Sequence, residues 1–179
     1  LEIPTDDARR QTVRLANPLA EDAPYLRTSV LDSLVDVARR NVSRGLTDVA
    51  VFEVGSVTHP AGTVPAPIPG TAGRPTDSEE TALEAGIPAQ PTHVGAVMTG
   101  ERERGGVLGA GRPWDWADAV DVVRTVASTL GVEIEVSAPE RPCAPWHPGR
   151  TAEIRLPGRR RGKEIEPGRL VAHAGELHP

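Results

Sequence analysis

The feature that most constrains this fold is an amphipathic segment at residues 29–44. Its apolar residues keep to one side of a helical wheel and its charged residues cover the other, which predicts an α-helix with one buried face. Thr28 or Ser29 can cap the first turn, and Gly45 is the expected stop. Such a helix must cover a sheet or another helix, because its apolar face is unstable in water.

The segment that follows, 47–57, is predicted to be a strand of that sheet. Apolar residues alternate onto both of its faces, which is typical of a strand in the middle of a sheet. Glu53 is the exception, because a carboxylate among apolar side chains needs a cationic or hydrogen-bonding partner. Arg27 or Arg44 could supply it. We interpret Glu53 as half of a structural ion pair rather than as a catalytic group, since structural networks also perturb carboxylates.

The remaining sequence alternates between predicted strands and helices, which indicates an α+β fold with helices packed on a mainly antiparallel sheet. The elements expected are a strand at 91–100, a helix at 116–130 with an inward stripe from Trp116 to Leu130, and strands at 132–137, 151–156 and 169–177. From about 59 to 91 the chain is rich in Pro, Gly, Thr and Ala. We predict a mobile loop there, with one helical turn near 78–85, inside a single domain spanning 1–179.

Composition narrows the possible functions. A net charge of -5 argues against a self-sufficient nucleic-acid-binding domain, which normally presents a basic face. Cys143 is the only cysteine, which excludes an internal disulfide and is typical of a reducing compartment. No apolar run is long enough to cross a bilayer. The chain starts at Leu1 rather than at Met, and we expect it to be a piece of a longer protein.

Two short motifs raise the question of a ligand site. The glycine-rich segment 100–113 lacks the Gly-Lys-Ser/Thr ending of a phosphate-binding loop, so we interpret it as a surface loop. Cys143 and His147 have a spacing that could begin a metal site, but a second pair of ligands is missing. His147 is better explained by a turn before the strand that starts at Thr151. No Ser-His-Asp arrangement or carboxylate pair stands out in the sequence.

One dense basic run interrupts the acidic chain near its end: Arg159, Arg160, Arg161 and Lys163. It could contact RNA phosphates. It could also be a solvated loop between the last two strands, and we favour that interpretation because charge runs are usually solvated.

Several blocks of the sequence together resemble the β subunit of bacterial phenylalanyl-tRNA synthetase. They are "NPL" at 17–19, Leu-Arg-Thr-Ser at 26–29 with the helix after it, "RN" and "RG" at 40–45, Phe-Glu-Val-Gly at 52–55, "GRPWDWADAVDVV" at 111–123, "WHPGRTAEI" at 146–154 and "GELHP" at 175–179. The blocks follow the family's order and cover most of the chain. The loop at about 59–91 and the basic run near Arg159 are the exceptions.

The resemblance implies a domain like the catalytic domain of class II synthetases, with an antiparallel sheet flanked by helices. In this family the β-subunit copy has lost catalysis and serves as a scaffold against the catalytic α subunit, in a heterotetramer of two α and two β subunits. Arg27, Thr28, Ser29 and Glu53 are then structural and interface candidates. The resemblance implies a cytoplasmic ligase that uses ATP and magnesium to charge tRNA(Phe), with tRNA contacts mainly through other domains and no cofactor in this segment.

Departures from the family pattern leave alternatives open. Val120 stands where the family often carries Lys, and the glycine-rich, arginine-bearing motif that holds ATP is absent. The family's magnesium-associated, editing and anticodon-binding residues belong to segments outside 1–179. We favour a non-catalytic scaffold domain of the ligase. The alternatives are a stand-alone synthetase-like binding or regulatory module and an active class II ligase domain, which lacks its ATP-binding arginine.

Overall fold

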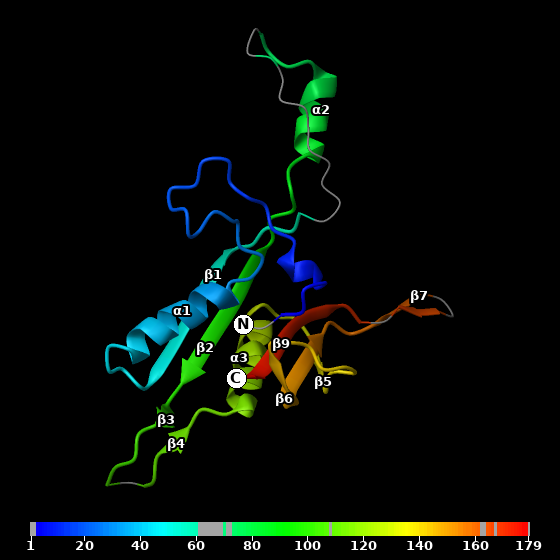
Figure 1. The fold of residues 1–179 in the computed structure, drawn as a ribbon. Helices are drawn as coiled ribbons and strands as arrows, with labels where there is room; N and C mark the ends of the chain where they lie inside the picture. Colours follow the sequence, from blue (N-terminus) through cyan, green and yellow to red (C-terminus); the bar gives the residue numbers. More distant parts are fainter. Residues whose placement is uncertain are drawn as a thin grey trace. The chain divides into compact units, whose positions relative to one another are not determined.

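A computed structural model describes residues 3–60, 70, 73–107, 109–161, 164–166 and 168–178. The helices are a short 3-10 helix at Ala8–Arg10, α1 at Leu31–Val42, α2 at Asp77–Ala85 and α3 at Trp116–Thr129. The strands are β1 at Val49–Ser56, β2 at Thr92–Thr99, β3 at Glu101–Glu103, β4 at Arg112–Pro113, β5 at Glu135–Ser137, β6 at Trp146–Arg155, β7 at Arg159–Arg161, β8 at Glu164–Glu166 and β9 at Leu170–Leu177. Figure 1 shows this order along an α+β chain with small antiparallel sheets.

The chain divides into two compact units, which we describe separately. One unit contains Thr5–Met98, and the other contains Thr99–Pro179 together with Leu1–Pro4. The interpretation of 1–179 as a single domain stays a prediction.

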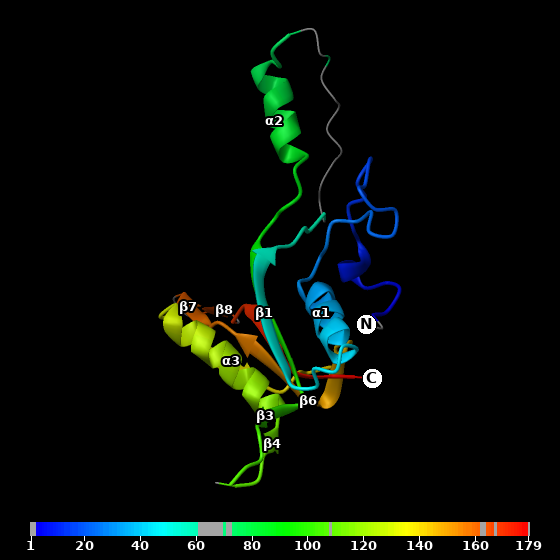
Figure 2. The same ribbon diagram turned by 90° about the vertical axis from the view of Figure 1, so that its left-hand side faces the viewer.

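In the unit Thr5–Met98, α1 packs on the two-stranded β1–β2 ladder. Val30 and Leu34 of the α1 segment are buried together with Val57, and Val51 and Val97 pack against them. Figure 2 shows α1 along one side of the two strands. The helix is shorter than the predicted 29–44, but its apolar face is the predicted one.

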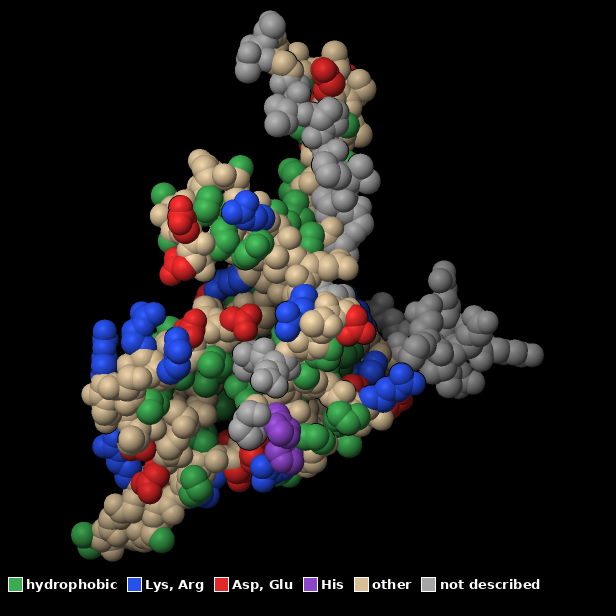
Figure 3. Space-filling view, viewed as in Figure 1, with side chains coloured by type: hydrophobic (Ala, Val, Ile, Leu, Met, Phe, Trp, Pro, Cys, Tyr) green, Lys and Arg blue, Asp and Glu red, His purple; other side chains and the backbone are tan. Residues whose placement is uncertain are grey.

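α1 ends where the sequence predicts. Gly45 has a φ of 90°, a backbone conformation that favours glycine. Its amide donates to the Val42 carbonyl and the Leu46 amide donates to the Asn41 carbonyl, the bond pair of a Schellman motif. Arg39 and Arg40 occupy the last turn, and positively charged side chains gather over α1 in Figure 3, which suits the negative end of the helix dipole.

The prediction that β1 is a central strand is wrong within the described residues. β1 pairs with β2 alone, and only one of its two apolar faces is covered. Phe52 is 77% exposed and Val54 is 59% exposed, whereas Val49 on the other face is buried. Alternating apolar residues indicate which side chains share a strand face, but they do not indicate whether that face is covered.

Between β1 and β2, the described residues 57–60, 70 and 73–91 include α2 and are called the arm here. Residues 61–69, 71 and 72 lie outside the described part, so the mobility of the loop stays a prediction. α2 is longer than the predicted turn and buries no side chain. Thr76 and Glu79 form a reciprocal capping box at its start. The His59 amide donates to the Ala89 carbonyl, so the two sides of the arm are still paired at its base.

In the unit Thr99–Pro179, α3 packs on the three-stranded β5–β6–β9 sheet. Its core contains Val120 from α3, Ala152 and the fully buried Ile154 from β6, and Ala174 from β9. Both neighbours of β6 are antiparallel to it. The burial of Val120 explains why a valine, rather than a charged lysine, suits this position.

Two details of this unit differ from the predictions. The ends of the predicted inward stripe of α3 are not covered: Trp116 is 46% exposed and Leu130 is 70% exposed. The predicted turn at His147 lies inside β6, whose pairing with β9 shifts between Trp146 and Thr151. Pro148 cannot donate a ladder hydrogen bond, and the irregular pairing accommodates it.

None of the helices in the described part of the chain is long and apolar enough to cross a membrane.

Candidate functional site

Arg27 is the centre of a polar cluster that joins the start of α1 to β1. Its Nη1 donates to Glu53 Oε1 and, at 3.2 Å, to Ser33 Oγ. Its Nε donates to the Ser56 carbonyl at 3.1 Å. Ser33 Oγ also lies 2.9 Å from Glu53 Oε2, so both carboxylate oxygens are satisfied. Of the two candidate partners for Glu53, the structure places Arg27 beside it.

The electrostatics of this cluster favour a structural role for Glu53. The hydrogen bonds from Arg27 and Ser33 hold the pKa of the Glu53 carboxyl below its usual range. A general base works best with a pKa near the operating pH, and lowering the pKa moves Glu53 away from it. The pair is half-buried, with about a third of each side chain exposed. It is suited to holding the start of α1 in place against β1.

The two hydroxyl residues beside Arg27 have different partners. Ser29 Oγ accepts a hydrogen bond from the Leu31 amide at 3.0 Å and so serves the first turn of α1. The Thr28 hydroxyl donates to the carbonyl of Arg9 at 2.9 Å, which ties the N-terminal segment to the mouth of the helix. Thr28 is therefore not a helix cap, although its residue type favours that position.

Sequence reasoning missed two members of the cluster, Ser33 and Gly55. A Cβ atom added to Gly55 would clash with Nη2 of Arg27, so the guanidinium lies across this glycine. The spacing carried a signal for both residues. Gly55 is two positions after Glu53 on the same strand face, and Ser33 lies on the α1 turn that faces that strand.

We predict that Arg27 and Glu53 are energetically coupled. Arg27→Ala should lower the midpoint of thermal unfolding because it leaves a half-buried carboxylate without its cation. Glu53→Gln in the Arg27→Ala background should recover part of that loss, since the unpaired charge is gone. A double-mutant cycle on thermal unfolding measures this coupling. Arg39→Ala is the control, because Arg39 pairs with Asp36 at an exposed site and should have little effect. Additive effects of the two substitutions would contradict the pairing.

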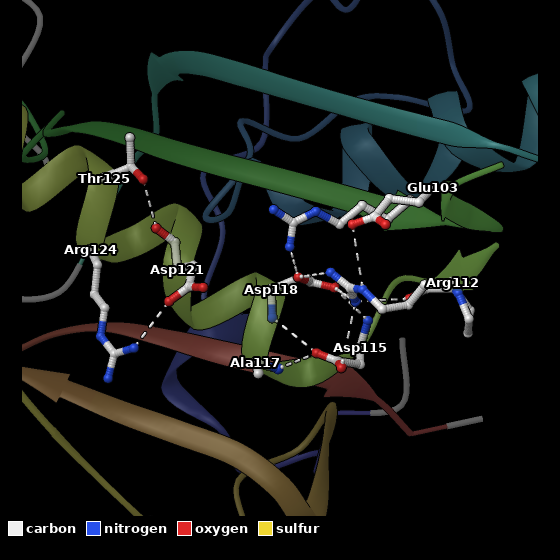
Figure 4. A network of polar contacts seen from close by, with 10 residues as sticks. Glu103, Arg112, Asp115, Ala117, Asp118, Asp121, Arg124 and Thr125 are labelled. Carbon is white, nitrogen blue, oxygen red and sulfur yellow. Dashed lines mark hydrogen bonds and ion pairs between the residues drawn. The ribbon is translucent and has the colours of Figure 1, made fainter. Parts of the chain in front are cut away.

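A second polar cluster surrounds Asp118 near the N-terminus of α3 (Figure 4). The Asp118 side chain is only 5% exposed. Arg112 Nη1 and Nη2 donate to its two oxygens at 2.8 and 2.9 Å, a bidentate arrangement. Arg102 donates to the same carboxylate and stacks over the Trp114 ring at 5.4 Å. The buried carboxylate thus fastens the β3–β4 hairpin to α3.

The same carboxylate caps the helix. Asp118 Oδ2 accepts from the Asp115 amide at 3.0 Å, and Asp115 Oδ1 accepts from the Ala117 and Asp118 amides at 2.8 and 3.1 Å. The hydrogen bonds from Arg112, helped by Arg102, hold the pKa of Asp118 far below its usual range although burial opposes them, and the pairing raises the pKa of Arg112. The ionised pair is therefore present throughout the neutral range.

This cluster argues against phosphate binding by the glycine-rich segment 100–113. Arg102 and Arg112, which flank its glycines, are both engaged by Asp118, and Glu103 and Asp115 add negative charge beside Arg112. The first amides of α3 are satisfied by Asp115. An entering phosphate would meet carboxylates in place of free donors. The sequence did not reveal Asp118 as the centre, because its two arginines come from a hairpin that was expected to be a loop.

The blocks "WHPGRTAEI" and "GELHP" meet across β6 and β9. Arg150 Nε lies 2.7 Å from Glu176 Oε2, and the rings of His147 and His178 stack with centroids 5.7 Å apart. Trp146 stacks on His173 in the same way, at 6.1 Å. The two closing blocks are therefore contacting halves of one structural feature, although twenty residues separate them in sequence.

The basic run lies in a small hairpin. Register places Arg159 opposite Glu166 and Arg161 opposite Glu164, while Arg160 stands opposite Ile165. Residues 159–161 form β7 rather than the predicted loop, and their solvation stays a prediction. Lys163 lies outside the described residues. The RNA contact stays an untested hypothesis.

The candidate metal ligands Cys143 and His147 have other partners. Over the described ranges no three His, Cys, Asp or Glu side chains gather in a way that could hold a metal ion. Cys143 Sγ contacts the Ala144 carbonyl at 3.7 Å. The His147 Nδ1 atom accepts from the Gly149 amide at 3.1 Å, so that nitrogen serves the local backbone.

The fold is of the α+β class, with helices packed on small antiparallel sheets. Residues 1–179 match the family described as phenylalanyl tRNA synthetase beta chain CLM domain, and the chain belongs to that family.

Individual relatives agree with this assignment. The chain is 49% identical to the phenylalanine–tRNA ligase beta subunit of Thermobifida fusca, over 100% of this chain and 21% of that protein. It is 44% identical to the Streptomyces avermitilis beta subunit over 97% of this chain and 20% of that protein, and 41% identical to that of Mycolicibacterium paratuberculosis over 99% and 20%. The chain therefore spans about a fifth of the length of the curated relatives it matches.

Proposed function

We propose that this chain is a non-catalytic scaffold domain of a phenylalanine–tRNA ligase beta subunit. In this role it supports ATP-dependent charging of tRNA(Phe) with phenylalanine by the catalytic α subunit, in the cytoplasm. The observation that carries the proposal is the engagement of the polar side chains: Arg27 with Glu53, and Arg102 and Arg112 with Asp118, hold helices to strands.

The small ladders are proposed to belong to one class II synthetase-like antiparallel sheet in the complete subunit. Support comes from the packing of α1 and α3 on these ladders. Arg27, Thr28, Ser29 and Glu53 are proposed to shape the mouth of α1 for contact with the catalytic subunit.

ATP and magnesium are proposed to act elsewhere in the ligase. The described residues do not fit an ATP–magnesium group, because the arginines beside the glycine-rich segment already bind Asp118 and no metal-type cluster accompanies them. We therefore assign no reaction step to this chain.

We predict that the chain alone does not activate phenylalanine. Phenylalanine-dependent exchange of pyrophosphate into ATP should stay at background with the pure chain and with the complete beta subunit. It should appear when the catalytic subunit is added. Exchange by the chain alone, removed by Arg102→Ala or Arg112→Ala, would establish the active-ligase alternative. The stand-alone regulatory alternative predicts that the chain forms no stable complex with the catalytic subunit.

A further inference from the structure

Two histidine side chains meet at the base of the arm. The rings of His59 and His93 lie with their centroids 5.7 Å apart and their planes tilted by 53°. His59 comes two residues after Val57 and His93 comes two residues before Gly95, and both Val57 and Gly95 face α1. Strand alternation therefore places the two imidazoles on the same side of the paired segments.

The backbone holds these two segments together where the histidines lie. The Val57 amide donates to the Pro91 carbonyl at 3.0 Å, and the His59 amide donates to the Ala89 carbonyl at 2.9 Å. The pairing of the two segments thus continues past the end of β1. The two rings are brought together by strand pairing, which also limits how far they can separate.

The ring nitrogens of this pair are open to a ligand. Both residues reach the surface, and in the described part of the chain neither ring makes a hydrogen bond. His147, by contrast, uses its Nδ1 atom to accept from the Gly149 amide. Desolvation and the neighbouring His59 lower the pKa of His93 below its usual range. His93 is therefore neutral at neutral pH, and neutral imidazole is the form that binds metal ions.

The separation of the rings fits a shared metal ion. An ion at about 2.0 Å from one nitrogen of each imidazole puts the ring centroids roughly 5–6 Å apart. The observed distance of 5.7 Å lies within this range. Ordinary contacts between rings allow the same separation, so the free ring nitrogens are the second observation on which the argument depends.

We propose that His59 and His93 form a binding site for one divalent transition-metal ion, with water in the remaining coordination positions. Imidazole suits Zn²⁺, Ni²⁺ and Cu²⁺, and Cu²⁺ forms the most stable complexes of the divalent series. A site with two protein ligands is weaker than a structural zinc site, which has four. The bound ion joins the segment that leaves β1 to the start of β2 and so fixes the base of the arm. The inference is independent of the proposed function.

The test measures metal binding by the complete beta subunit without a histidine tag. Ni²⁺ is the probe for calorimetric titration, because thiols do not reduce it. His59→Asn and His93→Asn should each weaken Ni²⁺ binding by about tenfold or more, since even indirect partners of metal ligands change affinity that much. Electron paramagnetic resonance with Cu²⁺ should report two ring nitrogens on the ion in the wild type and one in each variant.

His147→Asn is the matched control. His147 also belongs to a pair of rings with centroids 5.7 Å apart, but its Nδ1 atom is engaged by the Gly149 amide. Its loss should leave the Ni²⁺ affinity unaltered. Ni²⁺ should raise the midpoint of thermal unfolding in the wild type and in this control more than in His59→Asn or His93→Asn, because a ligand that binds the folded state stabilises it. Circular dichroism establishes that each variant is folded without metal.

Each outcome decides for or against the site. Loss of affinity in both His59→Asn and His93→Asn, with the control unaffected, supports it. Equal Ni²⁺ affinity in the wild type and these two variants overturns it. Loss in only one of the two variants overturns the shared site in favour of a single ligand. A comparable loss in His147→Asn also overturns it, because the effect would then not be specific to this pair.

Discussion

Asp118→Asn is expected to lower the free energy of unfolding by about 3 kcal/mol. The substitution removes the buried charge that Arg102 and Arg112 share and leaves two guanidinium groups facing a neutral amide. Breaking a buried ion pair costs roughly 3–5 kcal/mol, and the lower end applies because over a third of each arginine side chain reaches solvent. Urea unfolding followed by circular dichroism measures the loss.

The neighbouring pair supplies the control for this prediction. Asp121 lies one turn further along α3 and pairs with Arg124 at 3.0 Å, but both side chains are 60% exposed. Asp121→Asn removes the same charge from the same helix, and exposed pairs contribute little. Equal losses for the two substitutions would show that helix charge, rather than the buried cluster, determines stability.

The contribution of Asp118 to the free energy of unfolding should fall as the pH is lowered. Its pKa is lowered in the folded state, mainly by the hydrogen bonds from Arg112. The stabilisation is therefore fully present above the ordinary aspartate pKa of about 3.9 and is lost as pH falls below it. The stability difference between wild type and Asp118→Asn should be constant from neutral pH down to about 5 and shrink below about 4. A difference that grows on acidification would contradict the ion pair.

Gly95→Ala is expected to destabilise the unit Thr5–Met98 by about 1–3 kcal/mol, the usual cost of overpacking a core. The new Cβ would lie 2.6 Å from Val30 Cγ2 and 3.0 Å from Leu34 Cδ1. Both side chains are buried, and Val30 is β-branched, so neither can move away without disturbing α1. Thermal and urea unfolding of the single variant give the cost.

The cause can be isolated by removing the clashing atom. In a Val30→Ala background, Gly95→Ala should cost much less, because Cγ2 of Val30 is absent. Gly73→Ala is the neutral control, since nothing lies within 4 Å of a Cβ at that glycine. If Gly95→Ala costs the same in both backgrounds, the close approach of α1 to β2 is not its cause.

Local sequence patterns predicted the helices α1 and α3 well, but they predicted the short strands around them poorly. Period and glycine stops located α1 and α3, because both signals act within a few residues. The capping box of Thr76 and Glu79 was a local signal for α2 that the proline-rich composition obscured. The small strands β3, β4, β7 and β8 were missed, since segments of two or three residues carry no measurable alternation.

Of the contacts between residues distant in sequence, some could be predicted from the sequence and others could not. Glu53 needed a partner because it interrupts an apolar strand, and that need indicated Arg27 or Arg44. The structure places Arg27 beside it. Asp118 gave no such signal: at a helix N-terminus an acidic residue is ordinary, and nothing local reveals that it is buried. The pairing of Arg150 with Glu176 depends on the register of β6 and β9, which two sequence segments cannot specify without the sheet.

The base of the arm has a consequence for how this chain can change over evolution. His59 and Ala89 are bridge partners, so the polypeptide leaves the β1–β2 ladder and returns to it at the same point. α2, the described helix of that excursion, contributes no buried side chain. Residues can therefore be gained or lost between the two bridge partners without moving either strand, because the ends to be joined stay fixed. The arm is a place where lineages can differ in length while the ladder keeps its sequence.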